Sequence, residues 1–403
     1  MEKRKFHAWS DSSYDSKVLL INQTPQAYAE ITTLYSTVDF VSNDSRYSPW
    51  NNPDNIISHE MYLLIEHALL CYATPVFFLI GVPANFLSCL VFYRQGLQDR
   101  MNLCLFCLAF VDMLFIALFY AMSSHCMLGN VDTEIINWWK LITRKYLTGL
   151  YRGFLFSSGC LTMIISVERC VCVFLPMKAV AMVKTSTMGA LITVTILTLQ
   201  ILCLMYPMQL EVVQIQDAST NTSTFVLHST QLYRDNSVAF DILENIVIMT
   251  VIPFFTFTIV VMATILTVIQ LKRAIVWRTV ASSSANTKKE RGLVTMLVTV
   301  NCVFIVTASP NIALGLARIL VHEFWFTRRY ANIFLATHGG YIGLGMLNSS
   351  INFFVYIIRS SRFRQELRGL PLFGLCMAKK RRSTSLSLSA NTSTLVPTDT
   401  LVD

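Results

Sequence analysis

The sequence predicts an all-α membrane protein, a seven-transmembrane helix bundle with a short amphipathic C-terminal helix. Seven stretches each run about 26 residues with almost no charge, and an α-helix needs a segment of about 20 apolar residues to cross the hydrocarbon core. Only 14% of the residues are charged and 54% are hydrophobic, whereas soluble domains carry about 25% charged residues. A soluble fold of this length is therefore excluded.

The seven stretches form one domain between two polar flanks. We expect residues 1–61 to be a disordered extracellular segment and 371–403 a disordered cytoplasmic tail, because both are poor in residues that build a core. The seven-helix domain occupies 62–370. The expected spans are 62–93, 101–127, 146–175, 185–208, 241–271, 290–318 and 331–358.

Basic residues in the short loops predict the orientation of the chain. Lys and Arg collect on the cytoplasmic side of membrane proteins, and roughly 18 lie on one face here against roughly 7 on the other. We therefore expect a multi-pass plasma-membrane protein with its N-terminus outside and its C-terminus inside. The same bias accounts for most of the net charge of +8, so nucleic acid is not an expected partner.

The expected extracellular segments carry candidate modification sites. No apolar run follows the first five residues, so we expect the first span to serve as its own insertion signal. Three Asn-X-Ser/Thr sequons are candidate glycosylation sites, at Asn22, Asn43 and Asn221.

The cysteines fall almost entirely within the expected spans. Cys71 is placed inside the first span, and Cys126 alone lies near the outer surface. Because one outer cysteine cannot form an intramolecular bridge, we predict no extracellular disulfide. Cys376, among basic residues beyond the last span, is either a palmitoylation site or a plain free thiol.

Polar residues on four helices are expected to meet near the middle of the membrane. At 1.5 Å per residue they lie at one level, and an Asp there costs about 2.5–3.5 kcal/mol on insertion scales, so Asp112 should face the bundle interior. The residues are Asn85, Asp112, Ser158, Asn348, Ser349 and Asn352. The cluster either only holds the helices together by hydrogen bonds or binds a hard cation, for which sodium is the candidate.

Prolines and charges predict a movable sixth helix. Pro207, Pro253 and Pro310 each remove a backbone hydrogen bond within or near the end of a span, which leaves a hinge. Glu290 lies about 30 Å from Pro310 along the helix, at the cytoplasmic end beside Arg169. We therefore expect Arg169 to pair with Glu168 and Glu290 until the sixth helix swings outward.

The order and spacing of these residues resemble the rhodopsin-like (class A) G-protein-coupled receptors over about residues 62–370. After Tyr356, apolar residues recur at i, i+4 and i+7 among arginines, similar to the short helix on the inner membrane surface of that family. The residues that carry the resemblance are Gly81, Asn85, Leu108, Ala109, Asp112, Ser158, Glu168, Arg169, Cys170, Pro176, Pro253, Phe304, Pro310, Asn348, Ser349, Asn352, Phe353, Tyr356, Phe363, Leu367 and Leu370.

The resemblance implies a receptor, not an enzyme, that senses an extracellular ligand and activates a heterotrimeric G protein. Arg169 would contact the G protein, and Tyr356 would rearrange on activation. Pro253, Phe304 and Pro310 would form the activation hinge. Asp112 would bind sodium together with Ser158 and Asn348, and no other cofactor is expected.

The chain also departs from the family pattern. Cys170 replaces the usual tyrosine after Arg169, Phe353 replaces the proline of the seventh helix, and Ala308 replaces the sixth-helix tryptophan. Val261 occupies the place of the usual fifth-helix tyrosine. Arg144 stands where the family usually has the cysteine that bridges to the second outer loop, so we expect that loop to be held in another way.

The ligand is constrained mainly by what is missing. Tyr151 replaces the aspartate of amine receptors and Met346 replaces the lysine of opsins, which disfavours amines and retinal. A long second outer loop, a long outer N-terminus and several charges near the outer side suit a peptide or a small charged solute, as in the invertebrate neuropeptide receptors and lineage-expanded chemosensory receptors that the chain resembles. These charges are Arg144, Arg152, Glu244, Arg318 and Glu323. The candidate pocket residues are Tyr151, Arg152, Glu244 and Arg318. Arg152 could instead snorkel to the surface or only pair with Glu244.

Other functions of a seven-span protein fit the sequence less well. A transporter should show internal repeats, which are not found, and a channel with an intracellular N-terminus contradicts the charge count. Residues 383–400 are rich in Ser and Thr, which suits regulation by a receptor kinase and arrestin, or a solvated tether.

Overall fold

The computed structural model describes residues 52–127, 133–175, 184–217, 222–278, 285–321, 323–325 and 328–370. Only the backbone is described for residues 133, 216–217, 222–224, 274–278 and 285–291. The predictions for Asn22, Asn43, Asn221, Cys376 and the tail lie outside the described residues, as does the side chain of Glu290.

Seven helices in the described part of the chain are long and apolar enough to cross a membrane, which confirms the predicted bundle. They run over His59–Gln95, Arg100–Met127, Glu134–Phe174, Thr185–Gln209, Ser237–Arg273, Gly292–Leu320 and Ala331–Arg359. Large apolar side chains such as Leu79, Ile201 and Val306 are exposed on the outside of the bundle. A surface of that kind is suited to lipid.

The helices are divided into shorter elements. The first span comprises α2 (His59–His67), the π-helix η2 (Ala68–Ala73) and α3 (Thr74–Gln95), and the second α4 (Arg100–Ser123) and the 3-10 helix η3 (Ser124–Met127). The third and fourth are α5 (Thr133–Phe174), α7 (Thr185–Cys203) and α8 (Met205–Gln209). The last three spans comprise α10 (Ser237–Asp241), the π-helix η4 (Ile242–Val251), α11 (Ile252–Arg278), α12 (Ala285–Leu320) and α13 (Ala331–Arg359).

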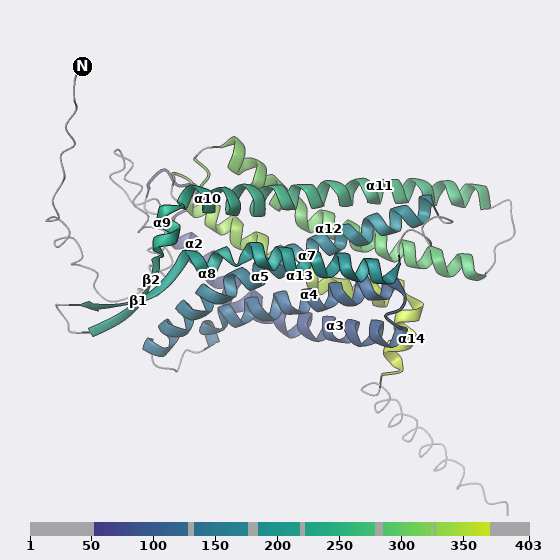
Figure 1. Cartoon of the computed structure of the whole chain (residues 1–403), viewed down its shortest axis with the longest axis horizontal. Coiled ribbons are helices and arrows are strands. Elements are labelled where there is room, and N and C mark those ends of the chain that lie inside the picture. The colour runs from purple at the N-terminus through teal and green to yellow at the C-terminus, as the bar shows by residue number, and fades with distance from the viewer. Residues whose placement is uncertain are drawn as a thin grey trace, which may run out of the picture.

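A β-hairpin and a short helix mark opposite ends of the bundle (Figure 1). Strands β1 (Leu210–Asp217) and β2 (Thr222–Ser229) pair antiparallel, with Leu210 opposite Ser229, and α9 (Gln231–Asp235) follows them. Helix α14 (Ser361–Arg368) lies at the other end, where Ser360 caps it through the amide of Phe363. We call these the hairpin end and the α14 end.

Helix α5 is the central element of the bundle, since it packs against α4, α7 and α11. It begins 13 residues before the predicted start of the third span. Four charged residues interrupt the apolar pattern there: Glu134, Lys140, Arg144 and Lys145. The helix continues through them, because their long side chains can extend to water without disturbing the backbone hydrogen bonds.

Aromatic packing attaches α14 to the bundle. The rings of Phe92, Tyr356 and Phe363 lie with their centroids 5.3–5.5 Å apart, and all three side chains are buried. Arg94 donates a hydrogen bond of 2.8 Å to the carbonyl of Gly369. The predicted amphipathic helix therefore rests on α3 and α13 through its apolar face.

The prediction that no disulfide bridges the outer cysteines is wrong. Cys71 on η2 and Cys126 on η3 are bonded at the hairpin end. The first helix is longer than the membrane requires, and 24 residues separate Cys71 from Gln95, which corresponds to about 36 Å against a core of about 30 Å. Cys71 therefore lies at the edge of the bundle beside Cys126, and not within the apolar core.

Candidate functional sites

A buried carboxylate joins three helices halfway along the bundle. Asp112 on α4 is completely buried, and its Oδ1 accepts hydrogen bonds from Ser158 Oγ at 2.6 Å and Ser349 Oγ at 2.7 Å. Asn352 Nδ2 donates to Oδ2 at 3.0 Å. A buried charge is tolerated when hydrogen bonds compensate it, so this cluster can hold Asp112 at that depth.

The other two residues expected at this level lie beside the cluster and do not contact Asp112 directly. Asn85 Nδ2 donates to the carbonyls of Gly81 and Ser349, and Asn348 Oδ1 accepts from Thr307 Oγ1 at 3.3 Å. The amide oxygens of Asn85 and Asn352 are buried without a hydrogen-bond partner among the described residues. Two acceptors therefore remain available next to the carboxylate.

A small cavity of about 60 Å³ adjoins the carboxylate cluster. It is lined by residues of the cluster and of the predicted hinge, which include Ser158, Asn348, Ser349, Pro253, Phe304 and Ala308. Pro310 lies inside α12, whereas Pro253 is the second residue of α11, two residues after the end of the π-helix η4. Because a cavity of this size can hold water, the helices are not packed solid at this point.

Tyr356 lies between this level and the α14 end. Its ring is fully buried against Phe92 and Phe363, and its hydroxyl has no hydrogen-bond partner among the described residues. A buried hydroxyl without a partner costs about 1–3 kcal/mol, which favours a second conformation in which it is satisfied.

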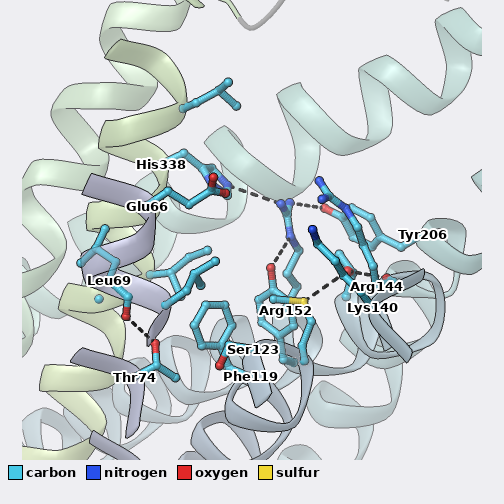
Figure 2. Close-up of a pocket in the computed structure, with 18 of the residues that line it drawn as sticks. Glu66, Leu69, Thr74, Phe119, Ser123, Lys140, Arg144, Arg152, Tyr206 and His338 are labelled. Atoms are coloured by element: carbon cyan, nitrogen blue, oxygen red, sulfur yellow. Dashed lines mark hydrogen bonds between the residues drawn. The ribbon is translucent and has the colours of Figure 1, made fainter. Parts of the chain in front are cut away.

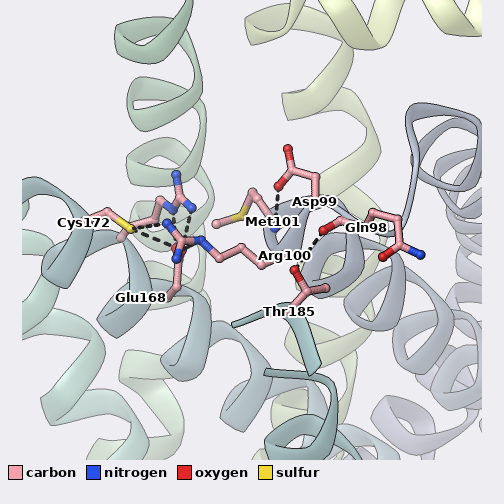
Figure 3. Close-up of polar contacts among 8 residues, drawn as sticks. Gln98, Asp99, Arg100, Met101, Glu168, Cys172 and Thr185 are labelled. Atoms are coloured by element: carbon pink, nitrogen blue, oxygen red, sulfur yellow. Dashed lines mark hydrogen bonds and ion pairs between the residues drawn. The ribbon is translucent and has the colours of Figure 1, made fainter. Parts of the chain in front are cut away.

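At the α14 end, one glutamate is shared by two arginines (Figure 3). The Glu168 side chain is 1% exposed and pairs with the guanidinium of Arg169 on the same helix. Arg100 Nε lies 3.0 Å from Glu168 Oε1, and its Nη2 donates to Cys172 Sγ at 3.3 Å. The predicted second span begins at residue 101, so Arg100 was expected in the loop before it and its contact with Glu168 was not predicted.

The loop before α4 places Arg100 at the start of the helix. Gly96 adopts a positive φ of 95°, which favours glycine, and Asp99 caps α4 by accepting from the amide of Met101. Thr185 Oγ1 donates to the carbonyl of Gln98 at 2.8 Å and so attaches the loop to α7. These contacts hold Arg100 next to Glu168 on α5.

A cavity of about 240 Å³ opens at the hairpin end (Figure 2). Its apolar wall includes Leu69, Leu70, Phe119, Ile342 and Met346, and charged side chains from three helices project into it. Of the predicted pocket residues, Tyr151, Arg152 and Glu244 line this cavity. Arg318 does not, and its guanidinium instead stacks over the ring of Phe334 at 5.1 Å from the centroid.

Arg152 is held by several partners within the cavity wall. Its guanidinium donates to Tyr206 Oη at 2.8 Å, lies 4.8 Å above the Tyr206 ring and is 3.4 Å from Glu244 Oε1. His338 Nε2 lies 3.4 Å from Nη2 of the same arginine. The contact with Glu244 that the sequence left open is therefore present, and Arg152 does not snorkel out of the bundle.

Glu66, Lys140 and Arg144 also line the cavity. The sequence indicated Arg144 as one of the outer charges suited to the ligand, but it did not indicate Glu66 or Lys140. Lys140 and Arg144 are four residues apart, a spacing that places both on one face of a helix. This signal was hidden because both residues were assigned to a loop before the third span.

The comparison with protein families gives one match. The model of the family described as 7 transmembrane receptor (rhodopsin family) matches residues 84–356, about two thirds of the chain. A search of curated proteins found no match. The matched range contains the carboxylate cluster, the paired Glu168 and Arg169, and Tyr356.

Proposed function

The chain belongs to the rhodopsin family of seven-transmembrane receptors, and from this premise we propose that it senses an extracellular ligand and activates a heterotrimeric G protein. It is a multi-pass membrane protein, and proteins of its family are receptors, not enzymes. The ligand would bind in the cavity at the hairpin end, and the G protein would bind at the α14 end.

We place the hairpin end outside the cell and the α14 end in the cytoplasm, in the plasma membrane. The excess of Lys and Arg in the loops of the α14 end supports this orientation. It also puts the cavity where a soluble ligand can enter and the basic tail where a receptor kinase and arrestin can reach it.

The burial of Glu168 between two arginines is the observation that carries the proposal. With Arg169 paired to Glu168, the Arg169 side chain is only 13% exposed and is shielded from a partner protein. Releasing it would present a positive charge at the α14 end, where a G protein can dock. Glu290 would be a second resting partner of Arg169, and that pairing remains a prediction.

The cavity of about 60 Å³ is lined by Pro253, Phe304 and Asn311, the residue after Pro310, and it supports a hinge at this depth. Movement of α12 there would widen the α14 end, because Pro310 leaves one helix carbonyl without its usual partner. Tyr356 would gain a hydrogen bond for its hydroxyl when the helices separate.

The carboxylate cluster suits a sodium ion in the resting state. Asp112 supplies the charge, Ser158 and Ser349 supply hydroxyls, and the amide oxygens of Asn85 and Asn352 are buried without partners. Oxygen ligands of this kind are those that hard cations prefer. A bound cation would neutralise Asp112 and so favour the packing in which these helices stay together.

The size and charge of the large cavity favour a small charged solute or the end of a peptide. At about 240 Å³ it is slightly smaller than most small-molecule pockets, so a long peptide would place only its terminal residues inside. A neuropeptide and a chemosensory solute both fit this description.

Nucleotide exchange on a purified heterotrimeric G protein tests the proposal. The full chain, reconstituted in lipid nanodiscs, should accelerate exchange, and Arg169→Gln should reduce this acceleration at least tenfold without lowering the amount of folded protein. A transporter or channel would give no acceleration. Unchanged exchange with Arg169→Gln would contradict the proposed docking site.

A further inference from the structure

From the charges in the cavity at the hairpin end, we infer that the ligand is an organic anion with an apolar body, and that Arg144 and Lys140 bind its acid group. This inference rests on the proposed function, because it assigns the chemistry of the ligand to the same cavity. Its main residue is Arg144, which stands where the family usually has a cysteine.

Basic side chains outnumber acidic ones in the lining of the cavity. Arg152 and Glu244 face each other at 3.4 Å, and Glu244 also accepts from Gln209 at 3.4 Å, so these two charges compensate each other. Of the other charged side chains in the lining, Lys140 and Arg144 are basic, and both act electrostatically on the carboxylate of Glu66. The lining therefore contains more basic than acidic side chains, and a wall of that sign attracts anions.

Arg144 lies in the wall of the cavity, where it can bind an anion. Its side chain is half-buried, lines the cavity and acts electrostatically on the carboxylate of Glu66, but no hydrogen bond or salt bridge of its guanidinium is found among the described residues. A guanidinium presents a planar set of donors that matches a carboxylate, and pairs of this kind are often bidentate. Lys140, one helical turn away on the same face, adds a second positive charge within reach of the same anion.

Much of the cavity lining is apolar. Leu69, Leu70, Phe119, Ile342 and Met346 line the same cavity as the charged side chains, and Figure 2 shows Leu69 and Phe119 among them. An apolar body resting on these residues leaves water, which contributes about 25 cal/mol per Å² of buried apolar surface. An anion without an apolar part would leave this surface wet, so the cavity selects against small inorganic ions.

Glu66 contributes a hydrogen-bond acceptor to the cavity. One of its carboxylate oxygens, Oε2, is buried without a hydrogen-bond partner among the described residues. A donor on the ligand next to its acid group would satisfy this oxygen. A carboxylate that follows an amide N–H combines these features, and it occurs both at the C-terminus of a peptide and in small N-acyl amino acids.

Binding to the full chain in nanodiscs, without G protein, tests the inference. The probes are N-acetyl-phenylalanine, its uncharged amide, 3-phenylpropionate, and a tripeptide with a C-terminal phenylalanine and a free carboxylate. Binding is measured from the rise of the unfolding midpoint with probe concentration. We expect N-acetyl-phenylalanine to bind at least tenfold more tightly than its amide, and more tightly than 3-phenylpropionate, which lacks the N–H donor. Tighter binding of the tripeptide would identify a peptide terminus, whereas tighter binding of the single residue would identify a small acid.

The variants locate the anion site. Arg144→Gln should weaken binding of N-acetyl-phenylalanine at least tenfold, and Arg144→Lys, which keeps the charge but loses the planar pair of donors, should retain only part of the affinity. The matched control is Lys145→Gln, which removes an equal charge one residue away, where the ammonium lies over the Tyr146 ring and not in the cavity. Glu66→Gln should narrow the difference between N-acetyl-phenylalanine and 3-phenylpropionate.

Three results would overturn the inference: no binding of any carboxylate probe, equal binding of the acid and its amide, or equal effects of Arg144→Gln and Lys145→Gln. Because these measurements contain no G protein, they are independent of nucleotide exchange. Specific binding without exchange would contradict the proposed coupling alone, and exchange without anion binding would contradict the ligand class alone.

Discussion

The guanidinium of Arg100 lies 3.0 Å from the carboxylate of Glu168, so the residue that holds Arg169 also has a partner on the neighbouring helix α4. When Arg169 leaves Glu168, the buried carboxylate keeps Arg100 and is not left without a counter-charge. Arg100 therefore stabilises the state in which Arg169 has been released.

Arg100→Gln should lower exchange in both the presence and the absence of ligand. The released state would leave Glu168 buried without a cation, and a loss of about 1 kcal/mol, discounted for the 20% exposure of Arg100, corresponds to about a fivefold fall. Arg100→Lys keeps the charge and should restore most of the exchange. Higher basal exchange with Arg100→Gln would show instead that Arg100 belongs to the restraint on Arg169.

Glu290→Ala should raise ligand-independent exchange, because it removes a proposed partner of Arg169 in the resting state. Each 1.4 kcal/mol removed from that state shifts the ratio of the two populations about tenfold. Exchange is measured at matched amounts of folded protein, and Glu290→Gln separates loss of charge from loss of the side chain. Flat basal exchange with both variants would remove Glu290 from the mechanism and leave Glu168 as the partner of Arg169.

Asp112→Asn should abolish the effect of sodium on the stability of the unliganded protein. A cation that binds only the folded state raises stability by RT ln(1 + [Na⁺]/Kd), about 1.4 kcal/mol at ten times Kd. The unfolding midpoint is followed while sodium replaces choline at constant ionic strength. If the wild type and Asp112→Asn respond equally to sodium, the cluster is only a hydrogen-bond network between helices.

The rise of a straight helix explains what the sequence could predict about the site. It places residues at a common depth, and this is why Asp112, Ser158, Ser349 and Asn352 were expected together and do meet. Depth does not give direction around the helix. Asn348 precedes Ser349 by one residue and is therefore turned by about 100° from it, so it contacts Thr307 and not Asp112.

Contacts beyond the apolar spans were harder to predict. The β1–β2 hairpin depends on pairing between strands that have little apolar alternation, and the start of α5 is masked by Lys140 and Arg144. The seven spans, in contrast, follow from length and apolarity alone. The sequence therefore predicted the fold well, and it predicted the cavity at the hairpin end only in part.

The bond between Cys71 and Cys126 should stabilise the hairpin end. It closes a loop of 55 residues across η2 and η3, for which chain entropy predicts about 4 kcal/mol, at the upper end of the typical contribution of a disulfide. The variant with both Cys71→Ser and Cys126→Ser should unfold at a lower temperature, and a reducing agent should lower the midpoint of the wild type but not that of the variant. Cys302→Ser, which removes an exposed free thiol, is the control and should change neither. Equal sensitivity of the double variant to reductant would mean that another thiol is responsible.

Close packing of α5 on α7 should depend on Gly149. A Cβ added there would overlap the carbonyl oxygen of Cys203, which is backbone and cannot rotate away, whereas a Cβ at Gly340 on α13 meets nothing within 4 Å. Gly149→Ala should therefore force the helices apart at a cost of about 1–3 kcal/mol, which equals or exceeds the gain in helix propensity of about 1 kcal/mol. Gly340→Ala obtains the same gain without the clash, so the informative quantity is the difference between the two unfolding midpoints in nanodiscs. Gly149→Ala should unfold at the lower temperature, and equal midpoints would show that α7 can shift away from α5 without loss.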